Sequence, residues 1–562
     1  MIWQYRVVAV LAIALLTACP SATPDPTPVE TPEQAEEIHL RLLAFNDFHG
    51  ALEGPTGSVM VGGERLETGG AEYFAAWLAE ERSEVDNVVT VAAGDLIGAT
   101  PLISALFRDE PTIEIMDAVG LDISSVGNHE FDAGVEELMR IVEGGCHADG
   151  CREGYEYGGA QFTYLAANVR WRESGETILP AYEIREFDGL KVAFIGMTLE
   201  NTPSVVVPSA VESVSFHNEV ETVNALVPGL QEKGVHSIVV LLHDGGRGTI
   251  DQNDISECPG VQGNIVPIAE GLDPMVSVIV SGHSHQPHIC EFSGKLVTQA
   301  GSSGRMFTVI DLRFDGETKT LLGREARQRP VTRDIEPHQG VLELVATYRE
   351  IAEPLANRAV AQITGDFIRG HRAEAGNSAM GQLIADSQLA ASAEEAGAQI
   401  AFMNPGGIRS SLRYSSEGQE REDGIVTYAD LHIVQPFGNV LITMTLTGAE
   451  IHQLLEQQWA DENRANIMAV SRGFSYTWDP AAERGSRVIA ESITLHGEPL
   501  DMEAEYRVTV NNFMADGGDG FVVLREGRNR TGGVVDLDAI VTYMSANSPL
   551  EPVVEARIIT KE

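Results

Sequence analysis

The sequence predicts an α/β fold built from two dissimilar halves. Between residues 38 and 314, short apolar runs typical of strands alternate with helical stretches, a pattern characteristic of layered α/β structures. After a longer helical stretch at 336–357 the pattern starts anew without repeating the first half. The chain has 562 residues, more than one hydrophobic core usually supports. We therefore expect at least two domains.

The elements of the first half follow from apolar runs of four to eight residues, each ending in polar residues or glycine. These runs predict strands at 38–45, 88–93, 123–126, 164–167, 192–195, 238–242 and 276–281. Helices are expected at 71–81, 133–141 and 219–232. The stretch 336–357 predicts a helix that joins the halves.

The second half predicts a different set of elements. Helices are expected at 378–391 and 448–459, and strands at 399–403, 440–446 and 506–511. We expect a first domain at 38–335, a linker helix and hinge at 336–362, and a second domain at 363–562.

The composition narrows the class of protein. Hydrophobic residues make up 43% of the chain and charged residues 22%, which excludes a disordered or fibrous protein. The formal net charge is −45, from 38 basic and 83 acidic residues. Such a surface repels nucleic-acid backbones, so we expect no DNA or RNA partner. No apolar run of 18 residues follows the first twenty positions, so no internal membrane span is expected.

The first residues predict export. Arg6 precedes an apolar run at 7–16, and small residues follow, as in a secretory signal peptide covering 1–18. The motif Leu-Thr-Ala-Cys at 16–19 resembles a bacterial lipobox, in which Cys19 is lipidated and becomes the first residue. The alternative is an ordinary signal peptide with a chance cysteine. The segment 19–37 is rich in Pro and Glu and predicts an extended tether.

Four further cysteines suggest two disulfides in an exported chain. Four cysteines allow three connectivities, and short loops favour Cys146–Cys151 and Cys258–Cys290. A zinc site is the alternative, but the spacings match no zinc-ribbon pattern.

Polar clusters directly follow five of the predicted strands. They read Asn-Asp-Phe-His-Gly at 46–50, Gly-Asp at 94–95, Gly-Asn-His-Glu at 127–130, His-Asp-Gly at 243–245 and Gly-His-Ser-His at 282–285. In α/β sheets, ligands gather at the carboxyl ends of strands. Asp, Asn and His suit divalent zinc, manganese or iron. A single such histidine is more often structural, but five clusters in order predict a two-metal centre.

The order of these motifs resembles the calcineurin-like metallophosphoesterases. The sequence motifs FNDFHG, GNHEFDAG and GHSH, together with the second half of the chain, resemble the 5'-nucleotidase family over roughly residues 38–550. The resemblance implies a layered α/β/β/α metallophosphoesterase domain, a linker helix and a separate C-terminal α+β substrate-binding domain.

The resemblance also implies two divalent metal ions, which could be Zn, Mn, Fe or Co. It assigns Asp47, His49 and His285 to one ion, Asn128, His243 and His283 to the other, and Asp95 to a bridge between them. Two ions ~3.5–4 Å apart can activate a water for attack on phosphorus and neutralise the phosphoryl oxygens.

The resemblance further implies a catalytic dyad of His129 and Asp132. His129 would face the phosphate and stabilise the transition state or donate a proton, and Asp132 would orient its ring. The alternative is that Asp132 caps the following helix. Glu130 is expected to be structural.

Residues of the second half are expected to bind substrate. The loop Asn-Pro-Gly-Gly-Ile-Arg at 404–409 resembles a family motif. In that motif an arginine binds an anion through two N–H groups of its guanidinium, and glycine amides approach a ligand closely. Phe437 and Phe513 would sandwich a base, although a Phe after Pro is more often core, and the arginine could lie on the surface. Of two candidates before residue 376, we choose Arg372 over Arg369. The predicted substrate-binding residues are Arg372, Asn404, Gly407, Arg409, Phe437, Phe513 and Asp519.

Together these features predict an exported phosphohydrolase, anchored by lipid and facing the periplasm or cell exterior. Its expected reaction is release of phosphate from nucleoside 5'-monophosphates, with UDP-sugars or other nucleotides as further substrates. Alternatives on the same fold are a 2',3'-cyclic nucleotide phosphodiesterase/3'-nucleotidase and a thiosulfohydrolase-like enzyme. A non-catalytic surface binding protein is an alternative of another class.

Overall fold

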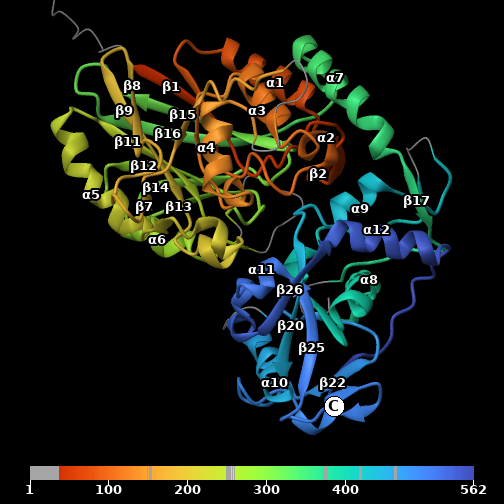
Figure 1. Cartoon of the computed structure of the whole chain (residues 1–562). Helices are drawn as coiled ribbons and strands as arrows, with labels where there is room; N and C mark the ends of the chain where they lie inside the picture. Colours follow the sequence, from red (N-terminus) through yellow and green to blue (C-terminus); the bar gives the residue numbers. More distant parts are fainter. Residues whose placement is uncertain are drawn as a thin grey trace, which may run out of the picture.

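The structure is a computed structural model that describes residues 37–561 apart from 148–149, 151–154, 249–254, 256, 259, 371–376, 417–420 and 461–464. The predicted signal peptide, the tether up to residue 36, Cys19, Cys151 and Arg372 lie outside the described residues. Figure 1 shows two lobes, one formed by the first half of the chain and one by the second, with helix α7 running along one side.

One six-stranded sheet begins the first domain, in the order β16-β15-β1-β4-β5-β6. Strands β1, β4, β5 and β6 are parallel, and β15 and β16 extend the sheet antiparallel beyond β1. Their bounds are β1 Ile38–Phe45, β4 Val88–Ala93, β5 Ile123–Ser125, β6 Thr163–Leu165, β15 Met306–Phe314 and β16 Leu321–Pro330.

A second six-stranded sheet has the order β13-β14-β12-β11-β9-β8, with parallel strands at its centre and antiparallel strands at both edges. Its strands are β8 Tyr182–Phe187, β9 Leu190–Thr198, β11 Ser237–His243, β12 Val276–Ser281, β13 His288–Phe292 and β14 Lys295–Gln299. Two-stranded ribbons accompany the sheets: β2 Gly57–Val61 with β3 Glu64–Thr68, and β7 Val169–Trp171 with β10 Val214–Phe216.

The two sheets pack face to face. Leu42 and Val91 of the first sheet share a buried cluster with Val239 and Val280 of the second. Helices α1 Ala71–Ser83, α3 Glu110–Ala118 and α4 Val135–Glu143 cover the outer face of the first sheet, and α5 Glu219–Glu232 and α6 Ile265–Gly271 cover the second. The predicted α/β/β/α layering is confirmed.

The second domain is built on a five-stranded mixed sheet in the order β21-β18-β25-β20-β26. The strands are β18 Ile400–Met403, β20 Val440–Thr447, β21 Ala469–Val470, β25 Glu505–Asn511 and β26 Arg528–Val535. Helices α8 Ala379–Ala396, α10 Gly448–Glu456 and α12 Asp536–Asn547 pack on it. A smaller sheet joins β22 Phe474–Trp478, β23 Thr494–Leu495, β24 Glu498–Pro499 and β27 Ile558–Thr560. The α+β expectation is confirmed.

Helix α7 (Gln339–Ala356) belongs to the first domain by its packing, because Val341, Val345 and Tyr348 lie in that domain's core. The next strand, β17 (Ala359–Gln362), pairs with β19 (Ile425–Thr427) of the second domain. The chain therefore passes from one domain to the other at residues 357–358. The helix α9 (Tyr428–Val434) then lies between α2 (Leu102–Ala105) and α12, as Figure 1 shows.

A disulfide joins Cys258 to Cys290, the pair that the sequence favours. It ties the segment before α6 to β13, at the edge of the second sheet. The other favoured pair, Cys146–Cys151, stays a prediction because Cys151 lies outside the described residues. Among the described helices, none combines the length and the apolar character that crossing a membrane requires.

Candidate metal centre and active site

The seven predicted metal ligands meet where the carboxyl ends of both sheets come together. Asp47 and His49 follow β1, Asp95 follows β4 and Asn128 follows β5 in the first sheet. In the second sheet, His243 ends β11, and His283 and His285 follow β12. Parallel strands thus bring together residues that are up to 238 positions apart in the chain.

The side chains form two adjoining groups. In one, His285 Nε2 lies 3.0 Å from Asp47 Oδ1 and 3.3 Å from His49 Nε2. In the other, His243 Nε2 lies 3.0 Å from Asp95 Oδ2, and this pair adjoins His283.

Two contacts complete this arrangement. His283 Nδ1 lies 2.9 Å from Asn128 Oδ1 in the second group. Asp95 Oδ2 is also 3.8 Å from His49 Nε2 of the first group. Asp95 therefore lies between the two groups, as expected of a bridging carboxylate.

The backbone of this region is unusual. Positive φ angles between 49° and 66° occur at five of the seven residues, namely Asp47, His49, Asp95, His283 and His285. Residues other than glycine rarely adopt this left-handed backbone conformation because it is strained. Backbone strain of this kind concentrates at functional sites. Hydrogen bonds hold the strained loops together, with Asp47 N donating to Gly94 O and His49 N donating to Asp95 O, both at 3.0 Å.

The imidazoles are oriented as metal ligands usually are. His49 Nδ1 donates to the carbonyl of Gly98 at 2.9 Å, and His243 Nδ1 donates to the carbonyl of Ala93 at 2.7 Å. These bonds direct each Nε2 toward the carboxylates. His243 Nε2 is buried and makes no hydrogen bond. A fully buried polar atom without a hydrogen bond, next to a carboxylate, fits a bound cation.

The electrostatics of the cluster also fit a cation. Burial lowers the pKa of His49 and of His283 to about 3, so both rings are neutral, the form that binds metals. Burial lowers the pKa of His243 as well, but the carboxylate of Asp95 raises it to about 10. A divalent cation beside Asp95 would balance the negative charge of the same buried carboxylates.

Glu130 holds together the loops that follow β4 and β5. Its carboxylate accepts backbone N–H bonds from Asp95 at 2.9 Å, Leu96 at 2.8 Å and Gly127 at 2.6 Å. These bonds tie the loop after β4 to the loop after β5. At Gly127 a Cβ atom would lie 2.2 Å from Asp95 Oδ1, so only glycine fits there. The structural role expected of Glu130 has a clear geometric basis.

The predicted dyad lies beside the candidate metal ligands. Asp132 Oδ2 accepts a hydrogen bond of 2.6 Å from His129 Nδ1, which leaves Nε2 facing the other way. Burial lowers the pKa of His129, but the charges of Asp132 and Asp95 raise it overall. The helix α4 begins after Gly134, and Asp132 does not cap it. His129 also lies close enough to His49 and Asp95 to share an ion with them.

Two residues of the second domain reach this dyad. The ring of Phe437 is parallel to that of His129, with an interplanar angle of 6° and centroids 5.7 Å apart. The guanidinium of Arg409 lies 5.6 Å from the Phe437 ring centroid. Burial lowers the pKa of Arg409, and Asp132 acts against this shift, so Arg409 also lies near the dyad.

The other predicted substrate residues lie a little further into the second domain. Asn404 Nδ2 donates to Asp519 Oδ2 at 2.7 Å, and Asn511 Nδ2 donates to Asn404 Oδ1 at 3.0 Å. The ring of Phe513 fills the space beside Gly518, where a Cβ atom would lie 2.4 Å from its Cζ.

The glycine and arginine candidates complete the set. Gly407 stands against Met403, where a Cβ atom would lie 2.4 Å from Cε. Arg372 lies outside the described residues. Arg369 donates to the carbonyls of Ile408 at 3.1 Å and Arg409 at 2.8 Å, and so supports the Arg409 loop.

A family model described as "Calcineurin-like phosphoesterase" matches residues 40–287, and one described as "5'-nucleotidase, C-terminal domain" matches residues 359–526. The first match spans the strands that carry all seven candidate ligands. The second spans Asn404, Arg409, Phe437, Phe513 and Asp519.

Similar proteins agree with these matches. The chain is 34% identical over 529 residues to "Endonuclease YhcR" of Bacillus subtilis, covering 93% of this chain and 41% of that protein. It is 30% identical over 555 residues to "Cell wall protein Lmo0130" of Listeria monocytogenes, covering 93% of this chain and 69% of that protein. The chain thus spans about two fifths of the first relative and two thirds of the second.

A solved structure shares the whole fold. The crystal structure of a 5'-nucleotidase precursor from Thermus thermophilus superposes with a TM-score of 0.74 at 29% identity, covering 93% of this chain and 99% of that one. Fold and site define a metal-dependent phosphoesterase. The chain belongs to the calcineurin-like metallophosphoesterases that carry a 5'-nucleotidase C-terminal domain.

Proposed function

We propose that this protein releases phosphate from nucleoside 5'-monophosphates, using two divalent metal ions held by the seven ligands. The observation that carries the proposal is the meeting of two residue sets at one place. The ligand cluster and the His129–Asp132 dyad come from the first domain. Phe437 of the second domain stacks on His129, and Arg409 lies beside Phe437 and close enough to Asp132 to interact with its charge. A phosphate and the group attached to it can therefore be bound together.

The metal ions, when bound, supply Lewis-acid charge that stabilises the phosphoryl group and activates water. Asp47, His49 and His285 would hold one ion, and Asn128, His243 and His283 the other, with Asp95 shared. Water attacks phosphorus, and the bond from phosphorus to the 5' oxygen breaks. His129 Nε2 then gives a proton to the leaving oxygen, while Asp132 keeps the other ring nitrogen protonated.

The chain must bind an anion although its net charge is −45. Arg409 provides a fixed positive charge near Asp132, and a guanidinium fork suits phosphate oxygens. Asp519 and Asn404, joined by a hydrogen bond, offer polar groups for a ribose or base edge. Phe513 offers an aromatic face for the base.

The test is hydrolysis by the purified protein with Mn²⁺, Zn²⁺ or Co²⁺, measured as phosphate release for the monoesters, as nucleotide products by chromatography for UDP-glucose and 2',3'-cyclic AMP, and as sulfate release for the sulfur substrates. The panel contains AMP, 3'-AMP, 2',3'-cyclic AMP, UDP-glucose, thiosulfate-derived sulfur substrates and glycerol phosphate. We expect AMP to be hydrolysed with the highest kcat/KM. Preference for the cyclic or 3' compounds, or for the sulfur substrates, would replace this proposal by the corresponding alternative. Metal-independent binding without turnover would identify a binding protein.

Phe513 supplies a sharper version of this test. Stacking contributes about 1–3 kcal/mol per base, so Phe513→Ala should lower kcat/KM for AMP by roughly 5- to 150-fold, mainly through KM. Glycerol phosphate has no base, so its hydrolysis should change by less than about twofold. Equal losses on both substrates in a folded variant would show that Phe513 is only packing.

We also propose export with a lipid anchor on Cys19. Support comes from the lipobox-like motif at 16–19 and from a relative named a cell wall protein. Cys19→Ser should shift the protein out of the detergent phase in phase-separation experiments, or leave it bound through an uncleaved signal peptide. Partition of the wild-type protein into the aqueous phase would contradict lipidation.

A further inference from the structure

The helix α9 connects the second domain to the catalytic loops of the first. Leu431 and Val434 pack into the core of the second domain. His432 lies between them in the sequence and contacts the first domain instead. Its Nε2 lies 3.1 Å from the carbonyl oxygen of Thr100. His432 is buried, with 7% of its surface exposed. Because a carbonyl only accepts hydrogen bonds, His432 must be the donor.

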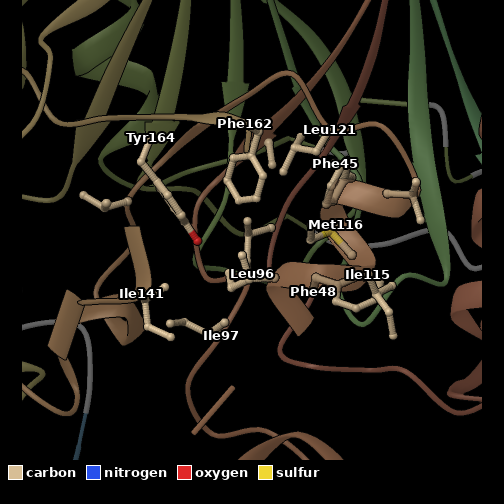
Figure 2. Packing of buried hydrophobic residues seen from close by; sticks show 14 of the residues in the cluster. Phe45, Phe48, Leu96, Ile97, Ile115, Met116, Leu121, Ile141, Phe162 and Tyr164 are labelled. Carbon is tan, nitrogen blue, oxygen red and sulfur yellow. The ribbon is translucent and has the colours of Figure 1, made fainter. Parts of the chain in front are cut away.

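Thr100 ends a loop that the catalytic centre depends on. The loop starts after Asp95, and Figure 2 shows its Leu96 and Ile97 packed among the side chains of the first core. Its next residue, Gly98, accepts the hydrogen bond from His49 Nδ1. A Cβ atom at Gly98 would lie 2.7 Å from the Cβ of His129, so the loop also touches the dyad.

The same loop is fastened at its far side by Asp109. This carboxylate accepts hydrogen bonds from Thr100 Oγ1 at 2.5 Å, Ser104 Oγ at 2.7 Å and Gly98 N at 3.3 Å. The carbonyl of Thr100 is therefore a fixed point of the first domain rather than part of a mobile turn. The hydrogen bond from His432 to this carbonyl therefore fixes the position of α9 relative to the first domain.

The position of α9 decides where Phe437 lies. Only Gln435 and Pro436 separate the end of α9 from Phe437. The Phe437 ring covers one side of the His129 imidazole. The His49 ring stands at 77° to the His129 ring, with centroids 5.1 Å apart. Together with the Asp132 hydrogen bond, these contacts fix the orientation of the His129 ring, the proposed proton donor.

We propose that His432 is a positioning residue for catalysis: its hydrogen bond to Thr100 across the domain interface holds Phe437 against His129. This inference rests on the proposed phosphate-ester hydrolysis but assigns a residue that the hydrolysis alone does not require. It also gives Phe437 a role besides contact with a base. Substrates with and without a base should then depend equally on His432.

The experiment compares His432→Leu, which keeps apolar volume and removes the donor, with His432→Gln, which keeps a side-chain N–H. His452→Leu is the matched control, because His452 also bonds a carbonyl, that of Val488 at 3.2 Å, but within the second domain. We expect His432→Leu to lower kcat on both AMP and glycerol phosphate on the order of 10-fold, with little change in KM. His432→Gln should recover most of the loss, and His452→Leu should match the wild type.

A double variant shows whether His432 acts through Phe437. On glycerol phosphate, Phe437→Ala should lower kcat by a similar factor, and adding His432→Leu should cause little further loss. Fully multiplicative losses would overturn the proposal, as would an unchanged kcat in folded His432→Leu. If His432→Leu does not fold, the test rests on Phe437→Ala. A kcat on glycerol phosphate equal to that of the wild type in this variant would also overturn the proposal. A wild-type protein that hydrolyses neither substrate would instead overturn the proposed function, and this inference with it.

Discussion

Asp95 lies between the two groups of candidate ligands. Its carboxylate lies 3.0 Å from His243 Nε2 and 3.8 Å from His49 Nε2, so it faces both ligand groups. Its backbone N–H donates a hydrogen bond to the carboxylate of Glu130, and its φ angle is 51°. This geometry supports the proposal that Asp95 is a shared ligand.

Asp95→Asn should therefore reduce metal binding at both positions. We expect elemental analysis after dialysis to show clearly less bound metal per chain, with AMP hydrolysis falling in parallel, because an amide lacks the negative charge that two cations share. Asp188→Asn, at an exposed carboxylate outside the site, is the control. Full metal content together with full activity in Asp95→Asn would rule out the bridging role.

His129→Ala separates catalyst from ligand. If His129 acts as proton donor, the variant should keep its metal while kcat falls by roughly 10²–10⁴. Metal content and kcat are measured on the same preparation. Loss of an ion would instead make His129 a ligand, an outcome that its closeness to His49 and Asp95 allows. Asp132→Asn should cost less, because the ring itself remains.

The candidate ligands could be predicted from the sequence because each lies in a short motif directly after an apolar strand. The role of Arg369 could not be predicted, because its acceptors lie about 40 residues away. The same holds for His432, whose partner is 332 residues away. The one available signal was a histidine on an apolar helical stretch just before Pro-Phe-Gly-Asn, and such a histidine is usually only core.

At the scale of elements, strands that read as continuous apolar runs were predictable, whereas the buried strands β14 and β15 and the charged edge strands β16 and β26 were not. The ranges 38–45, 88–93 and 276–281 coincide with β1, β4 and β12, because these strands are buried on both faces and read as continuous apolar runs. Strands β16 and β26 lie at sheet edges and carry several charged residues, so they show no comparable run. Their existence follows only from pairing with β15 and β20.

The Cys258–Cys290 disulfide should stabilise the second sheet's edge without serving catalysis. It closes a loop across 32 positions, and a loop of that size contributes roughly 2–4 kcal/mol. The double variant Cys258→Ser/Cys290→Ser should unfold at lower urea concentration while keeping kcat under native conditions. An unchanged unfolding midpoint would mean that β13 and β14 hold this edge without the bond.

At the scale of the whole molecule, the two domains meet over the active site. Phe437 and His432 touch the first domain, and the connection between α7 and β17 is only two residues long. Because Phe437 stacks on His129 and His432 bonds Thr100, a substrate that binds between the two domains must enter past these contacts. We therefore expect the domains to separate during each turnover, with the hinge near residues 357–362.

A cross-link tests this motion. Ser209 Oγ of the first domain donates to Asp516 Oδ2 at 3.2 Å, and Asp516 directly follows α11 (Asn512–Ala515), the helix that carries Phe513. Oxidised Ser209→Cys/Asp516→Cys should lose turnover of AMP by at least about 10-fold, because a locked interface prevents substrate entry and product release. Reductant should restore it, and each single-cysteine variant, treated alike, should stay active throughout. A protein shown by non-reducing electrophoresis to be fully cross-linked, yet turning over AMP at the wild-type rate, would mean that substrate reaches the metals without any opening of the domains.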